Sequence, residues 1–254
     1  PAESFLDLVG NTPLVKLRAA SEITGCDIYG KAEFLNPGGS VKDRAAKAII
    51  EAAEADGTLS HGGTIIEGTA GNTGISLALA ANSRGYKTII VMPETQSQEK
   101  KDALRVAKAD LKLVPALPYR DPGNYIRVSQ SMALEMQKKP NSNVVWANQF
   151  DNIANKNGHF SSTGPEIWKQ TKGKIDGFIC AVGSGGTIAG VGSYLKTCNE
   201  NIAIGLADPL GSALFNYYQK GELKSVGNSI SEGIGQGRIT ENLRGFKPDY
   251  CFQI

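Results

Sequence analysis

The feature of this 254-residue chain that most constrains its fold is the regular alternation of short apolar, β-branched runs with stretches of helical composition. Alternating strands and helices predict an α/β fold, in which mostly parallel sheets carry helices on both faces. Ligands of such folds bind at the carboxyl ends of the strands. We expect strands at 14–17, 28–34, 64–67, 88–91, 111–114, 144–147, 177–182, 202–206 and 250–254. We expect helices at 45–56, 74–84, 98–107, 125–138, 163–170, 187–197 and 212–220.

Composition excludes several classes of function. The 27 Lys and Arg residues against 25 Asp and Glu residues give a formal net charge of +2, too balanced to indicate a nucleic-acid or anionic-membrane partner. No apolar run approaches the eighteen or so residues of a membrane span. The four cysteines form no CxxC pair, which predicts neither a disulfide framework nor a zinc site and favours a reducing, cytoplasmic compartment. With two histidines, a His-based metal centre or a Ser-His-Asp triad is not expected.

One lysine stands between a glycine-rich turn and a helix. In the segment 36–44, Pro37 to Gly39 end a strand, and Lys42 falls in the first turn of the helix that follows. The positive end of the helix dipole lowers the pKa of a lysine placed there. A neutral, partly desolvated amine is what carbonyl chemistry requires, as in Schiff bases with pyridoxal phosphate (PLP). The alternative is a solvated surface lysine beside a turn.

A second motif, residues 67–74, connects the strand 64–67 to the next helix. Its small residues expose several backbone N–H groups at a helix N-terminus, which is a natural site for a carboxylate. Thr69 and Thr73 add hydroxyl donors, and Asn72 offers an amide to a ring oxygen or a carbonyl. The alternative is an ordinary strand-to-helix turn with an Asn cap.

A third motif follows the strand 177–182 and consists of Gly183, Ser184, Gly185, Gly186 and Thr187. Its glycines allow consecutive N–H groups to point inward at a helix N-terminus, so that the loop forms a cradle for a phosphate. A dinucleotide fingerprint is excluded because Ile188 stands where its third glycine belongs. The Gly-Lys-Ser/Thr ending of a nucleotide P-loop is also absent, so the motif predicts one phosphate. Simple packing of strand on helix is the alternative.

A reactive lysine, a carboxylate loop and a single-phosphate cradle are what PLP and an amino-acid substrate require together. The chain resembles the cysteine synthase (O-acetylserine sulfhydrylase) and cystathionine β-synthase branch of the fold type II PLP enzymes. The motifs that carry this resemblance, in order along the chain, are 10–14, 36–44, 69–74, 92–95, 163–168, 183–187 and 232–235. They are specific for the family and less specific for the substrate.

The resemblance implies a tryptophan synthase β-like architecture of two three-layer αβα domains. Residues 40–145 would form a small mobile domain that closes on the substrate. Residues 1–39 and 146–254 would form the large domain that binds the cofactor phosphate. Relatives continue for several dozen residues beyond the position of Ile254, so the C-terminal part of the large domain is expected to be missing.

The resemblance also implies residue roles. Lys42 would bond the cofactor covalently and then act as the acid/base, while Asn72 would contact its ring oxygen. The phosphate would be held by Gly183, Ser184, Gly185, Gly186 and Thr187. The substrate carboxylate would be held by Thr69, Ala70, Gly71, Thr73 and Gln149, with Gly233 near the substrate amine. Many relatives have serine at the position of Ala70, so one hydroxyl donor is missing here. No metal is implied.

The implied reaction is a PLP-dependent β-replacement that makes L-cysteine from O-acetylserine and sulfide. Implied partners are a second copy in a homodimer and the enzyme serine acetyltransferase. The alternative within enzymes is the cystathionine β-synthase-like condensation of serine with homocysteine; no haem-binding extension or regulatory pair is seen, which favours the synthase. A threonine dehydratase relative is disfavoured because that branch usually has phenylalanine at the position of Val41. A non-catalytic scaffold on the same fold is disfavoured because a scaffold needs neither Lys42 nor the phosphate loop.

Overall fold

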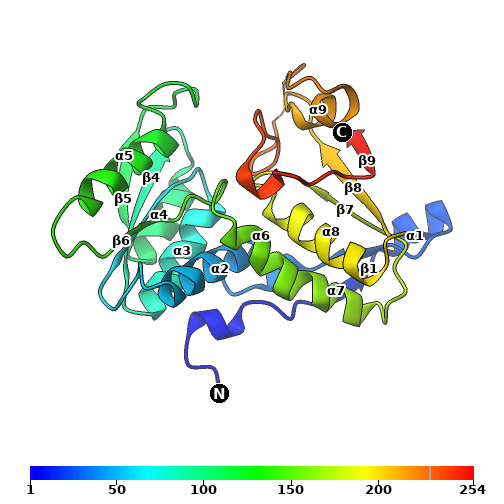
Figure 1. The fold of residues 1–254 in the computed structure, drawn as a ribbon, viewed down its shortest axis with the longest axis horizontal. Helices are drawn as coiled ribbons and strands as arrows, with labels where there is room; N and C mark the ends of the chain where they lie inside the picture. Colours follow the sequence, from blue (N-terminus) through cyan, green and yellow to red (C-terminus); the bar gives the residue numbers. More distant parts are fainter. Residues whose placement is uncertain (229) are drawn as a thin grey trace.

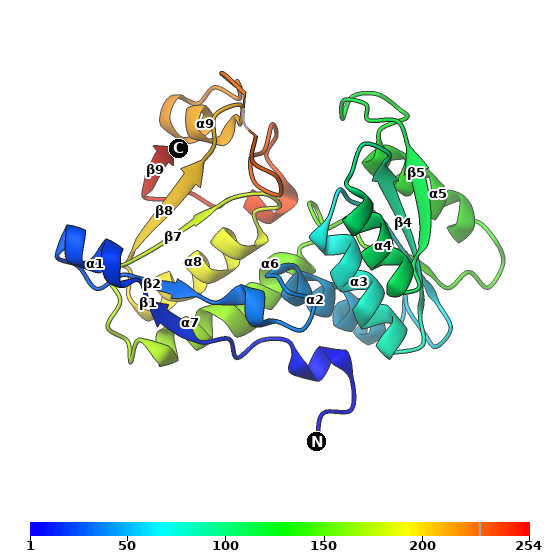
Figure 2. The same cartoon turned by 180° about the vertical axis from the view of Figure 1, so that it is seen from behind.

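The computed structural model describes residues 1–228 and 230–254. Its two parallel sheets lie side by side (Figure 1). The first has the strand order β5(Asp110–Val114), β4(Lys87–Pro93), β3(Thr64–Gly68), β6(Val144–Trp146). The second has the order β7(Gly177–Ala181), β8(Ala203–Asp208), β9(Tyr250–Gln253). A short antiparallel pair, β1(Leu14–Lys16) and β2(Tyr29–Lys31), lies below the second sheet in Figure 2. The prediction of an α/β fold with mostly parallel sheets is confirmed.

Helices cover both faces of the first sheet. On one face, α2(Lys42–Ala55) and α3(Asn72–Ser83) bury Ile49, Ile50 and Leu77 against the strands, with α4(Gln98–Val106) beside α3. On the other face lies α5(Tyr125–Gln137), which contacts β3, β4 and β6. The two central strands, β3 and β4, are buried along most of their length, which explains their apolar sequences.

The second sheet packs one face against α8(Gly186–Cys198) and α7(Gly164–Gln170), around Ile188, Val191 and Leu195. The loop to β9 and the helix α9(Leu214–Lys220) complete this core. On the opposite face, Ile179 and Tyr250 are more than half exposed. The loop after β7 therefore extends from a sheet that helices cover on one face.

Most element bounds match the sequence prediction to within three residues, but some regions differ. The predicted strand 28–34 ends at Lys31, and the chain turns into a 3-10 helix, Glu33–Leu35, because Glu33 bonds Arg44 instead of continuing the strand. The predicted helix 163–170 is the last part of a longer helical run, which starts with α6(Ala154–Gly158) and a π-helix, His159–Thr163.

This helical run was missed because its sequence is rich in Asn, Gly and Ser, which are poor helix formers. Tertiary packing explains the choice of glycine. A Cβ on Gly158 would lie 2.4 Å from Cβ of Ala48 in α2, and a Cβ on Gly164 would lie 2.7 Å from Cβ of Tyr194 in α8. The glycines allow close approach of the run to both helices. The helix α1(Arg18–Thr24) was also not predicted.

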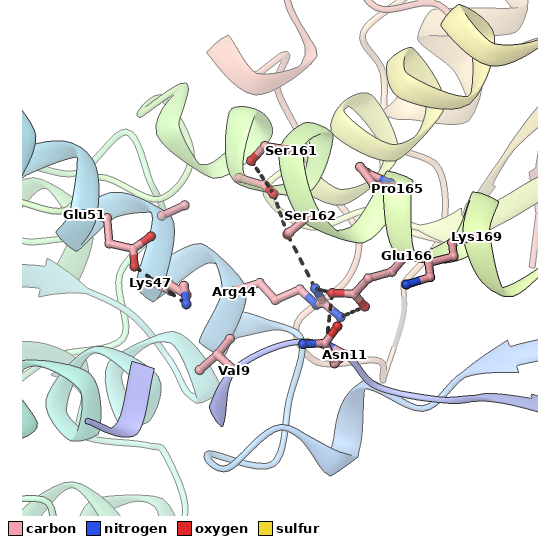
Figure 3. Close-up of a pocket in the computed structure, with 12 residues that line it drawn as sticks. Val9, Asn11, Arg44, Lys47, Glu51, Ser161, Ser162, Pro165, Glu166 and Lys169 are labelled. Carbon is pink, nitrogen blue, oxygen red and sulfur yellow. Dashed lines mark hydrogen bonds and ion pairs between the residues drawn. The ribbon is translucent and has the colours of Figure 1, made fainter. Parts of the chain in front are cut away.

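An ion cluster around Arg44 joins three separate segments. The buried guanidinium of Arg44, on α2, bonds Glu33 and Glu166, each at 2.7 Å, and Lys31 bonds Glu166 at 2.7 Å. Figure 3 shows Arg44 beside Glu166 of α7. Burial opposes ionisation of Glu166, but hydrogen bonds from Arg44 and Lys31 outweigh it and lower its pKa to about 2. The cluster fixes the start of α2 relative to the N-terminal segment and α7.

Replacing Arg44 by methionine should destabilise the fold by about 3–5 kcal/mol, because two carboxylates are left without their buried partner. Urea unfolding followed by circular dichroism measures the change in the free energy of unfolding. Arg105→Met is the control: its ion pair with Asp102 is more than half exposed on both sides, so a loss below about 1 kcal/mol is expected. Equal losses in the two variants would contradict the role given to the cluster.

Candidate active site

Lys42 is the first residue of α2, as its sequence context predicts. Its side chain faces away from the Arg44 side of the helix, toward β7 of the second sheet, where the thiol of Cys180 lies near enough to interact with its charge. Burial lowers the pKa of the Lys42 amine, and the interaction with Cys180 only partly opposes this. The predicted direction of the pKa change is confirmed, with desolvation as its main cause. The amine is therefore biased toward the neutral, nucleophilic form.

The turn before Lys42 is held by its own side chains. Asp43 accepts the N–H of Gly38 at 2.6 Å and the hydroxyl of Ser76 at 2.5 Å. Gly38 has no room for a side chain, since a Cβ there would lie 2.3 Å from Oδ1 of Asp43. Gly39 has a φ of +80° and closes the turn with an N–H bond of 2.8 Å to the carbonyl of Asn36. These contacts fix the backbone of Lys42 where the turn ends and the helix begins.

The predicted carboxylate loop connects β3 to α3. The helix begins at Asn72, two residues earlier than predicted, so that Asn72 is its first residue and Gly71 its N-cap. Thr69 is buried, and its hydroxyl accepts the N–H of Gly71 at 3.2 Å. Ala70 lies between them with its side chain partly exposed. The loop is thus ordered by its own threonine while its helix N-terminus stays open to a ligand.

The predicted phosphate loop connects β7 to α8, which begins at Gly186. Side chains are sterically excluded from its glycines. A Cβ placed on Gly183 would lie 2.5 Å from the carbonyl oxygen of Gly233. A Cβ on Gly185 would lie 2.4 Å from the side chain of Leu243, and a Cβ on Gly186 would lie 2.2 Å from Oδ1 of Asn155. Bare backbone at the N-terminus of a 13-residue helix is suited to hold one anion. The contact with Gly233 brings the loop 232–237 onto the phosphate loop.

Hydrogen bonds link the two loops through residues far apart in the sequence. The Thr73 hydroxyl donates to Oε1 of Gln149 at 2.7 Å, and Asn155 Nδ2 donates to the carbonyl of Gln149 at 2.9 Å. The same Asn155 amide donates to the Ser184 hydroxyl at 2.9 Å. The relay therefore brings the predicted carboxylate residues and the predicted phosphate residues into one region. Sequence reasoning had named Gln149 but missed Asn155, for which no local motif gives a signal.

His159, predicted to be structural, lies fully inside this region. Its Nδ1 is 2.8 Å from the Thr163 hydroxyl and its Nε2 is 3.2 Å from the Thr187 hydroxyl. Burial, with the charge of Arg44 nearby, lowers the pKa of His159 to about 3, so that the ring is neutral at physiological pH. A neutral ring can orient the hydroxyl of Thr187 through a hydrogen bond. It carries no charge that would attract or repel a ligand.

Glu67 is a second buried group that sequence reasoning did not single out. It is the penultimate residue of β3, shortly before the carboxylate loop, and is 1% exposed; among the residues that the structure describes, its Oε2 has no hydrogen-bond partner. Burial raises its pKa to about 8, although hydrogen bonding from Gln149 works against this. At neutral pH the group is held mostly as the uncharged acid.

A cavity of about 460 Å³ lies beside α2 (Figure 3). It is lined by Arg44, Lys47, Glu51 and Glu166 together with residues of the helical run, and none of its lining residues is a predicted site residue. Residues of α2 at Lys42 and at Lys47 face opposite directions because of the helical period. The cavity is therefore separate from the candidate site.

The chain belongs to the family of pyridoxal-phosphate dependent enzymes, whose sequence signature matches residues 5–246. The donor set described above fits that cofactor: an amine biased toward neutrality, a single-anion cradle and an open helix N-terminus for a carboxylate. Among residues 1–228 and 230–254, no helix is both long and apolar enough to cross a membrane.

Known relatives cover nearly the whole chain. It is 52% identical over 246 residues to cysteine synthase 1 of Neurospora crassa, which matches 96% of this chain and 64% of the relative. It is 47% identical over 234 residues to cystathionine beta-synthase of Apis mellifera, which matches 91% of this chain and 45% of the relative. The structure is similar to that of O-ureido-L-serine synthase, with a TM-score of 0.87, 33% identity, and coverage of 99% of this chain and 76% of the other. The chain thus spans about 64% of the length of the cysteine synthase relative.

Replacing Glu67 by glutamine should flatten the pH dependence of stability. Because the folded-state pKa of about 8 lies above the usual 4.5, Glu67 contributes stability that is fully present below about pH 4.5 and is lost as the pH rises through 8. Melting temperatures of wild type and variant, measured from pH 5 to pH 9, should diverge between about pH 5 and pH 8, where the wild type falls more steeply, and should run parallel above pH 8. Parallel curves over the whole range would show that Glu67 is not held as the acid.

Proposed function

We propose that this chain carries the cofactor and substrate site of a cysteine synthase, a PLP-dependent enzyme that makes L-cysteine and acetate from O-acetylserine and sulfide. The observation that carries the proposal is a lysine amine biased toward neutrality at a helix N-terminus, with a single-anion cradle in the same region. The high identity to a cysteine synthase over 96% of the chain supports this substrate class above others.

For the cofactor, we infer that Lys42 forms the covalent link and that Asn72 contacts the ring oxygen. Gly183, Ser184, Gly185, Gly186 and Thr187 would hold the phosphate through backbone N–H groups and hydroxyls. The Thr187 hydroxyl is well suited to this because His159 orients it. The α8 dipole would favour the phosphate charge.

For the substrate, we infer that the carboxylate binds the loop of Thr69, Ala70, Gly71 and Thr73, with Gln149 completing it. The alanine supplies a backbone N–H but no hydroxyl, so the loop would bind through its remaining donors. Gly233 would lie near the substrate amine. The bond between Thr73 and Gln149 supports a joint role for these two residues.

PLP, when bound, supplies a ring that withdraws electrons from the α-carbon of the substrate. The residues of this chain would do the rest. The amine of Lys42 would accept the α-proton, and its lowered pKa favours the unprotonated form that can do so. The carboxylate loop would fix the orientation of the substrate while acetate leaves and sulfide adds at the β-carbon. Closure of the domain formed by residues 40–145 would exclude water.

Condensation of serine with homocysteine is the second candidate, because the chain is also 47% identical to a cystathionine beta-synthase. Both reactions would use the same lysine and loops and would differ in the acceptor. We further propose that the protein acts in the cytoplasm as a homodimer and associates with serine acetyltransferase. The four unpaired cysteines suit a reducing compartment.

The proposal is tested by incubating the PLP-loaded protein with O-acetylserine and sulfide and measuring L-cysteine. Formation of cysteine is expected, with activity lost in Lys42→Ala and kept in Lys220→Ala, which changes an exposed lysine at the end of α9. Product formed only from serine and homocysteine would favour the second candidate. Activity that survives in Lys42→Ala would contradict the assignment of the lysine.

Substitution of Gly186 by alanine should weaken PLP binding by about tenfold or more, because overpacking costs on the order of 1–3 kcal/mol. The added methyl group would collide with the Asn155 amide and displace the phosphate loop. Equilibrium titration with PLP, followed by visible absorbance, measures the change. Gly237→Ala is the matched control, since a Cβ there meets nothing within 4 Å and its binding should equal that of the wild type.

A further inference from the structure

Lys100 lies at the point where the two halves of the candidate site meet. It is the third residue of α4, on the first sheet, and its ammonium bonds Glu232, 132 residues further along the chain. Glu232 belongs to the loop 232–237, which rests on the phosphate loop: the N–H of Gly235 bonds the Val182 carbonyl at 2.7 Å. The ion pair therefore spans from the side of the carboxylate loop to the side of the phosphate loop.

The ammonium of Lys100 also lies over the carboxylate loop itself. A Cβ placed on Gly71 would be 3.8 Å from Cε and 3.9 Å from Nζ of Lys100. The side chain is held there by Gln96, whose Oε1 accepts from Nζ at 3.0 Å. An ammonium has three donors, and Gln96 and Glu232 take two of them. Within residues 1–228 and 230–254 the third has no acceptor, so it can serve a ligand at the loop.

Stability of the helix does not explain this lysine. A cation in the first turn opposes the helix dipole, so Lys100 is disfavoured where it stands unless an anion is present. Glu232 supplies such an anion, but its side chain is 70% exposed and such pairs are weak. A second carboxylate that reached the loop, and was also bound by backbone N–H groups, would compete well for the same ammonium.

We propose that Lys100 is a substrate-binding residue that supplies the positive charge for the carboxylate of the incoming amino acid, and that Glu232 occupies this charge until the substrate replaces it. The inference rests on the proposed function, because it assigns the ligand of the loop 69–73 to an amino-acid carboxylate. It adds a charged residue to a loop whose own donors are all neutral. The exchange also couples substrate binding to the contact between α4 and the loop 232–237.

Calorimetric titration of the PLP-loaded protein tests the proposal with two ligands, L-alanine and L-alaninamide. L-Alanine has the amine and carboxylate of the substrate but no leaving group, and the amide lacks the negative charge. Lys100→Met should weaken L-alanine binding about tenfold, the size expected for a hydrogen bond between charged groups, and leave L-alaninamide unchanged. Lys100→Arg keeps the positive charge, so it should keep most of the affinity for L-alanine. The salt dependence of L-alanine binding should also be the same as in the wild type.

Two further variants complete the test. Lys101→Met removes a neighbouring lysine of α4 that bonds the Glu94 carbonyl instead, and should bind L-alanine like the wild type. Glu232→Gln removes the competing carboxylate and should tighten L-alanine binding.

The inference is overturned if Lys100→Met binds L-alanine as well as the wild type, or loses affinity for both ligands equally, which would indicate a structural role. Weaker L-alanine binding in Glu232→Gln would contradict the proposal that the substrate carboxylate replaces Glu232 at Lys100. A PLP-loaded wild type that binds neither ligand would overturn the proposed function and this inference with it. If the wild type binds and only the variants disagree, the proposed function stands and the role of Lys100 alone fails.

Discussion

The buried guanidinium of Arg44 is the interaction on which the candidate site most depends. Two carboxylates from segments 133 residues apart, Glu33 and Glu166, converge on it and fix the first turn of α2. Because the amine of Lys42 lies only two residues away, any shift of that turn would move it. The ion cluster on one side of the helix and the Lys42 amine on the other are therefore parts of one arrangement, in which charge pairing in the protein interior positions the amine that we propose to react in its uncharged form.

The site combines loops from two sheets, and polar side chains between the sheets hold those loops together. Thr73 reaches Gln149, and Asn155 connects Gln149 with Ser184, so that the loop after β3 and the loop after β7 share one hydrogen-bond relay. Both loops end at helix N-termini, which makes the region attractive to two separate anions. This is the electrostatic pattern that a phosphate-bearing cofactor and an amino-acid carboxylate require at the same time.

Local chemistry made part of this predictable from sequence. Lys42 and the glycines from Gly183 to Gly186 could be recognised in the sequence because each belongs to a glycine-rich turn between a strand and a helix, a local pattern that favours a ligand site. The contacts of Asn155, His159 and Lys100 could not be predicted, since each depends on packing between segments far apart in the chain. The same cause explains two wrong element predictions. The strand predicted at 28–34 is shorter because pairing of Glu33 with Arg44 overrides β propensity. The π-helix was not predicted because tertiary packing there overrides a weak helix propensity.

The central claim is that the amine of Lys42 is the point of covalent attachment for PLP. Reduction of the PLP-loaded protein with borohydride makes that bond permanent, and mass spectrometry of its peptides then locates the modified residue. The account predicts that the pyridoxyl phosphate group is found on Lys42 and on no other lysine in significant amount. Modification of a different lysine, or a protein that binds PLP and carries no modification after reduction, would contradict it.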